Sequence, residues 1–496
     1  MHPAFAEAAT LSVMGISGVA AGLLFGIRQW VPLGILALAF SVVTRVWSAF
    51  TVWSLGWFTW LSEAWWVVSA VLIASATGLF IRQWRVAFKA TTLVAAASLV
   101  ALASKYIFDA GEKHHTDSAK QIALAVIAIG GEVDDLQHVA NSPKRGIAYS
   151  LMLGLGPDGR VFSAFTPLVF IATMLLVVWL AWKMVDSRAS LTAFVIASTA
   201  VGLFSVSVPM FRVAMFYMNA HTLMGFGLLL TVAGLILAIK EKEFSRLTLA
   251  FVTLGGVIGA TARIEGIVAI AAVLAALVGS RRHWTTSERV NLFASVSLIG
   301  ASFTWWLDAV DSPVLDDFGL NPPLLTAASL LAGLIASQRA IDGIRRYIWP
   351  TFAVGTIGVL ALGMARWSDV LPNLDGLWLN LGLGRGGWGT AAYMFFATVV
   401  LLGYRRRSFL YRYLLRLVGL LLAVLVITKG FDGTGFGISF GRESFFDSLN
   451  RMWLHVMPVV MAMTILGYSE LLERVQPKNR SSSTDETSAR PTVINR

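Results

Sequence analysis

Apolar runs long enough to cross a bilayer alternate with short polar segments over most of the 496 residues. A helix of about 20 residues spans the hydrocarbon core of a membrane. The pattern therefore predicts an all-α polytopic membrane protein with about 13–15 transmembrane helices. The expected apolar segments are residues 8–26, 31–50, 64–82, 88–107, 163–183, 189–208, 218–239, 247–261, 264–280, 291–307, 322–337, 347–365, 388–404, 416–428 and 452–468.

Lysine and arginine gather in short clusters between these runs, as is typical of cytoplasmic loops. The clusters are Arg82/Arg85/Lys89, Lys183/Arg188, Lys240/Lys242/Arg246, Arg281/Arg282/Arg289, Arg339/Arg345/Arg346, Arg405/Arg406/Arg407 with Arg412 and Arg416, and the chain from Arg474. Alternation then places residues 108–162, 209–217, 308–321, 366–387 and 429–451 outside the cytoplasm. The assignment is weakest for the first two segments, because it leaves Arg45 on the outer side.

Composition agrees with a membrane protein and narrows its chemistry. The chain is 56% apolar and 14% charged, whereas soluble domains carry about 25% charged residues. The net charge of +11 comes mostly from the cytoplasmic clusters, so it does not indicate a nucleic-acid partner. Cysteine is absent from the sequence, which excludes disulfides, thiolate catalysis and iron–sulfur clusters. No Walker A motif is present, which argues against an NTP-driven pump.

The chain divides into N-terminal transmembrane helices (1–87), a central module (88–468) and a polar, Ser/Thr-rich cytoplasmic tail (469–496) expected to be disordered. The central module contains a large first extracytoplasmic loop (108–162). Apolar residues recur at helical spacing from Ile122 to Ile129, which predicts an amphipathic helix on the membrane surface.

That helix is expected to begin after Thr116 or Asp117 as N-cap, with Lys120 and Gln121 off its apolar face. A second stretch, residues 146–155, is expected to turn back toward the membrane.

The outer loop concentrates ionisable side chains in a chain that is otherwise apolar. Asp109 and Asp117 are candidate general bases, since a carboxylate can take a proton from a hydroxyl within hydrogen-bond reach. His114 and His115 are candidate substrate contacts beside them. The alternative is a solvated loop with a surface helix and no chemistry.

Two short apolar segments flank Arg263 and Glu265, and each has basic residues at the end that is farther from Arg263 in the sequence. The chain is therefore expected to cross toward the outer side, turn near Arg263 and return. Charges at membrane depth are costly, so they pair or serve function. One interpretation is an Arg–Glu ion pair with no further role. The other has Arg263 holding a phosphate, because its planar fork matches phosphate oxygens, with Glu265 contacting substrate.

Further polar residues lie at the outer ends of two later helices. Arg451 and His455 are four residues apart and share one helix face, where they either anchor the helix at the interface or bind an anion. Tyr217, Asn219 and His221 precede or begin another helix and are candidate substrate contacts. No helical zinc-binding spacing is present, so no metal is assigned, although a divalent cation held by His221 with the outer-loop histidines stays open.

Several short segments, in order along residues 88–468, resemble the C-type polytopic glycosyltransferases that use polyprenyl-phosphate sugars. The outer loop carries the sequence DSAKQIALA and ends in KRGIAY, a hairpin reads TARIEG, and the last outer junction reads RMWLHVMP. The chain departs from the family in its extra N-terminal helices and in Ile264, where the family has proline.

The resemblance implies inverting sugar transfer at the outer face, without a nucleotide site. Asp117 or Asp109 would be the base, and the donor phosphate would be held by Arg263, by Arg451 and His455, and by Lys144 and Arg145.

The implied partners are a polyprenyl-phosphate sugar, a glycan, lipid or protein acceptor, and membrane lipids. The expected location is the inner (plasma) membrane, multi-pass, with the site facing the periplasm or exterior. A transporter or flippase of lipid-linked sugars is one rival, although no repeat between the halves is evident. A glycan polymerase or ligase, with its key loop at residues 429–451, is another.

Overall fold

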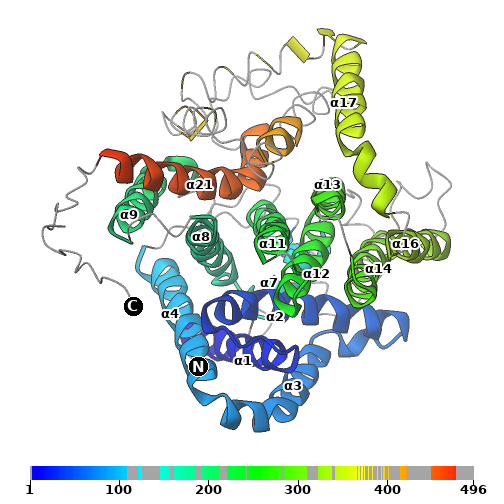
Figure 1. Ribbon diagram of the computed structural model, residues 1–496. Helices are drawn as coiled ribbons and strands as arrows, with labels where there is room; N and C mark the ends of the chain where they lie inside the picture. The colour runs from blue at the N-terminus through cyan, green and yellow to red at the C-terminus, as the bar shows by residue number, and fades with distance from the viewer. Residues whose placement is uncertain are drawn as a thin grey trace, which may run out of the picture.

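The computed structural model describes most of the chain as a bundle of helices (Figure 1). The described residues are 3–108, 121–123, 125, 146–156, 161–185, 191–211, 220–241, 243–280, 284–309, 322–337, 341–365, 414–421 and 448–475, with scattered positions between 367 and 400. Of these residues 91% are helical, and none forms a strand.

The helices overlap the predicted apolar segments, and several extend beyond them. They are α1 (Pro3–Leu24), α2 (Trp30–Ser54), the 3-10 helix η1 (Phe58–Trp60), α3 (Glu63–Arg82), α4 (Trp84–Phe108), α7 (Ile147–Leu153), α8 (Phe165–Met184), α9 (Leu191–Ser207), α11 (Ala220–Glu241), α12 (Arg246–Ala262), α13 (Ile264–Ser280), α14 (Thr286–Ala309), α16 (Pro322–Ser337), α17 (Ile341–Ala365) and α21 (Ser448–Val475). Because α21 continues to residue 475, residues 469–475 of the tail predicted to be disordered are helical.

Eight helices within the described ranges are long and apolar enough to cross a membrane, and five shorter apolar helices accompany them. The protein is therefore a multi-pass, all-α membrane protein, as the sequence predicted at this level. The expected 13–15 spans and the surface helices of the outer loop stay predictions.

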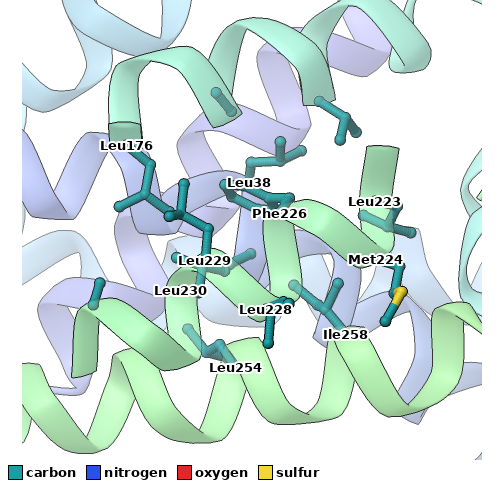
Figure 2. Packing of buried hydrophobic residues seen from close by; sticks show 14 of the residues in the cluster. Leu38, Leu176, Leu223, Met224, Phe226, Leu228, Leu229, Leu230, Leu254 and Ile258 are labelled. Carbon is teal, nitrogen blue, oxygen red and sulfur yellow. The ribbon is translucent and has the colours of Figure 1, made fainter. Parts of the chain in front are cut away.

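Helix α11 lies at the centre of the bundle, packed against α7, α8, α12, α13 and α21 (Figure 1). Nineteen of its residues are buried. Figure 2 shows its apolar side chains, including Phe226, Leu228 and Leu229, meeting Leu176 of α8 and Ile258 of α12. A helix that is apolar all round belongs inside a membrane bundle, so α11 can carry polar chemistry only at its ends.

Contacts sort the helix ends into two groups. One group joins α1, α4 and the start of α8 through Glu7, Lys105 and Ser163. The opposite group includes Lys240 at the end of α11, which donates to the Val185 carbonyl after α8, and Phe244, whose N–H donates to Glu288. Ser163 and Val185 lie at opposite ends of α8, so the two groups lie at opposite ends of that helix, while the predicted orientation in the membrane stays a prediction.

Candidate functional site

Helices α12 and α13 form a tight antiparallel hairpin with Arg263 as the only residue between them. Arg263 is extended (φ −157°, ψ 152°), which interrupts the helix. The helices approach closely beyond it, because a Cβ on Gly266 would lie 1.8 Å from the Gly259 carbonyl oxygen. Only glycine fits at position 266. Because α12 ends at Ala262 and α13 begins at Ile264, the turn predicted near Arg263 is confirmed.

Helices α11 and α21 also meet closely at this end of the bundle. Pro458 lies inside α21 and has no N–H, so it cannot donate to the carbonyl of Leu454, four residues earlier. A Cβ on Gly225 of α11 would lie 2.6 Å from that carbonyl oxygen. Because His221 is one turn before Gly225 and His455 follows Leu454, the close approach brings the two imidazoles together.

Four ionisable side chains form a continuous hydrogen-bonded row, which we call the tetrad: Glu265, Arg263, His221 and His455. Arg263 Nε and Nη2 donate to the two Glu265 carboxylate oxygens at 3.2 and 3.1 Å. Arg263 Nη1 lies 3.4 Å from His221 Nε2, and His221 Nδ1 lies 2.7 Å from His455 Nε2. The two imidazole rings stack with their centroids 4.9 Å apart.

The arginine determines the proton positions in this row. A guanidinium only donates, so His221 Nε2 accepts and carries no hydrogen in this arrangement. The hydrogen of neutral His221 is then on Nδ1 and is donated to His455 Nε2. Adding a proton to either ring therefore breaks one link of the row, and the pair can pass a proton only by rearranging.

Burial of the ionisable side chains of the tetrad costs free energy. His221, His455 and Arg263 are 3%, 2% and 7% exposed, while the Glu265 side chain is 27% exposed. The row therefore runs inward from a partly open carboxylate. Three of the five N–H groups of Arg263 are used, and two have no partner among the described residues. Those two donors suit an oxyanion.

The end of the outer loop reaches the hairpin tip through α7. A Cβ on Gly146, the residue before α7, would lie 2.0 Å from the carbonyl of Ala262. Every residue of α7 is buried, as expected for a stretch that returns toward the membrane. The prediction that Gln121 lies on a polar surface face is wrong: it is 1% exposed and hydrogen-bonds the Ser150 hydroxyl of α7. A buried hydroxyl that donates to its amide oxygen outweighs the surface periodicity.

The structure thus brings together four of the predicted site residues, namely Arg263, Glu265, His221 and His455. Arg263 pairs with Glu265, as the first interpretation has it, and the phosphate-binding interpretation stays a prediction. Arg451 lies on α21, and its side chain is outside the described set. The other candidates lie outside the described residues: Asp109, Asp117, His114, His115, Lys144, Arg145, Tyr217 and Asn219.

Within the described ranges, no three His, Asp or Glu side chains are placed to hold a metal ion. The sequence did not reveal the direct pairing of His221 with His455. The available signal was Pro458, three residues after His455, together with Gly225, one turn after His221. Comparison of the chain with family models, curated proteins and solved structures gives no match.

Proposed function

We propose that the protein transfers a sugar from a polyprenyl-phosphate donor to an acceptor hydroxyl, with Arg263 of the tetrad binding the donor phosphate. The observation that carries the proposal is Arg263, a buried guanidinium at the tip of a membrane hairpin, two of whose N–H groups have no partner within the described ranges. A donor already activated by phosphate requires no nucleotide site, in line with the absence of a Walker A motif.

The reaction needs one bond formed and one broken. The acceptor oxygen attacks the anomeric carbon from the face opposite the phosphate, and its proton passes to Asp117, or to Asp109 as the second choice. The bond between the anomeric carbon and the phosphate oxygen breaks, so the configuration inverts. Arg263 stabilises the negative charge that grows on the leaving polyprenyl phosphate.

Contacts of the outer loop support this assignment of the base. Gln121 lies four residues after Asp117 and bonds α7, and α7 begins at Gly146 against the hairpin tip. Gln121, four positions from the candidate base in the sequence, is therefore tied to the helix that touches the hairpin. The proposed orientation has this end of the bundle facing the periplasm or exterior.

Sugar transfer from radiolabelled polyprenyl-phosphate sugars into membrane glycan, lipid or protein tests the proposal. Arg263→Ala should lower transfer about 10²–10³-fold, as loss of a charge-stabilising donor does. Arg263→Lys should recover only part, because lysine lacks the planar fork. Arg82→Ala, an exposed arginine at the end of α3, is the matched control and should retain wild-type transfer.

The same assay tests the assignment of the base and distinguishes sugar transfer from transport. Asp117→Asn or Asp109→Asn should abolish transfer without loss of protein from the membrane. Full transfer by both variants overturns the assignment of the base. Movement of intact donor across the bilayer without cleavage establishes a transporter instead.

A further inference from the structure

Arg45 is a charged side chain buried in the bundle away from the tetrad. It lies on α2 and is 0% exposed. Its Nε donates to the Leu151 carbonyl at 3.2 Å, and its Nη1 donates to the Leu61 carbonyl. Its Nη2 is buried and has no hydrogen-bond partner in the part of the chain that the structure describes. The exposed Glu63 at the start of α3 interacts with it electrostatically.

A buried guanidinium without a carboxylate in contact is costly, and an apolar residue of similar size would pack there at lower cost. The reason for an arginine at this position is therefore to be sought in the two carbonyl groups that it binds. Leu61 belongs to the connection between α2 and α3, and Leu151 belongs to α7.

Arg45 completes the hydrogen bonding of the α7 C-terminus. A helix leaves its last four carbonyls without intrahelical partners. In α7 the carbonyls of Ser150, Met152 and Leu153 accept from the backbone N–H groups of residues 154, 155 and 162. The fourth, Leu151, accepts from Arg45. A seven-residue helix has little stability of its own, so this bond matters to its placement.

The other end of α7 touches the candidate site. Gly146 leaves no room for a Cβ against the Ala262 carbonyl, which directly precedes Arg263. Ser150, near the middle of α7, is hydrogen-bonded to Gln121 of the outer loop. Helix α7 therefore connects Arg45 to the hairpin tip and to the outer loop at once.

We propose that Arg45 is a positioning residue: by holding the Leu151 and Leu61 carbonyls it fixes α7 against the hairpin tip, and so aligns Gln121, which bonds α7, with the hairpin at Arg263. It touches neither donor nor acceptor. The alignment role rests on the proposed function, whereas the clamping of α7 does not, and the two can be measured separately.

Thiol labelling measures the clamp without any enzymatic readout, because the chain contains no cysteine. Ser150→Cys places a buried thiol on α7, and Ser295→Cys places an equally buried thiol on α14 as the matched control. A membrane-permeant maleimide reacts when a thiol becomes accessible. Adding Arg45→Met should raise the labelling rate at position 150 by about ten- to hundred-fold, and leave position 295 unchanged. Arg45→Lys should give an intermediate rate.

Equal protection of position 150 with and without Arg45 overturns the clamp. Faster labelling at both positions also overturns it, because Arg45 would then support the whole fold. Transfer by Arg45→Met tests alignment separately: kcat should fall with an unchanged donor KM, since Arg45 contacts no substrate. An unchanged kcat, with position 150 exposed, refutes alignment. Absence of transfer in the wild type refutes the proposed function but leaves the clamp standing.

Discussion

Gly146→Ala is the smallest change that separates α7 from the hairpin tip. Gly146 has φ −68° and ψ 148°, a conformation open to any residue, so alanine brings no backbone strain. Its Cβ would lie 2.0 Å from both the carbonyl carbon and oxygen of Ala262 and 2.2 Å from the Thr261 carbonyl oxygen. These are backbone atoms, which cannot rotate away, and ordinary contact begins near 3.4 Å.

The two segments must therefore separate by about 1.4 Å. Overpacking of this kind costs about 1–3 kcal/mol of folding free energy. A displacement of about 1 Å near reacting groups can lower a rate about 10²-fold. We expect Gly146→Ala to unfold at a lower temperature in detergent and to lose most sugar transfer.

Gly78→Ala on α3 is the matched control, because nothing lies within 4 Å of its Cβ position. It should retain transfer and be as stable as the wild type or about 0.5–1 kcal/mol more stable. The reasoning is refuted if Gly146→Ala unfolds and transfers like the wild type. The unfolding measurement tests the contact even if the substrate is of another class.

Three further changes test the ionisable groups. His221→Gln and His455→Gln should be non-additive in a double-mutant cycle of unfolding, with a coupling of about 0.5–3 kcal/mol; additivity contradicts their hydrogen bond. Glu265→Gln should tighten inhibition by polyprenyl phosphate about three- to tenfold, because it frees the hairpin guanidinium; unchanged or weaker inhibition refutes competition between carboxylate and phosphate. Lys105→Met should destabilise by about 1–3 kcal/mol, since the Glu7 carboxylate is buried 2.5 Å from Nζ, and adding Glu7→Gln should recover most of the loss. No recovery would show that the pair itself is not the cause.

The hairpin at Arg263 could be predicted from the sequence because its signals are local. Two short apolar runs lie between basic clusters and leave room for a single turn. Arg263 is the polar residue at which the first apolar run ends. The helices on either side begin and end within a residue or two of the predicted segments.

The pairing of His221 with His455 could not be predicted, because 234 residues separate them. Their contact depends on the close packing of α11 against α21. Two features allow that packing: Pro458 leaves a carbonyl of α21 free, and Gly225 of α11 has no side chain. Periodicity marks apolar faces but not which helices meet.

The surroundings of Gln121 were misjudged, and those of Arg45 were not predicted, for a related reason. Sequence reasoning placed Gln121 on the polar side of a surface helix and named no partner for Arg45. In the structure each lies inside the bundle with a specific partner on α7. Buried polar side chains with partners distant in sequence are invisible to a pattern of apolar positions.

The most direct test of the account is an experimental structure of the protein with a non-hydrolysable polyprenyl-phosphate sugar analogue bound. We expect the phosphate to lie within about 3 Å of Arg263 Nη1 or Nη2, with the Asp117 or Asp109 carboxylate facing the same cavity beside the anomeric carbon. A phosphate bound elsewhere, or both carboxylates directed to a separate cavity or to the opposite side of the membrane, would contradict the proposal.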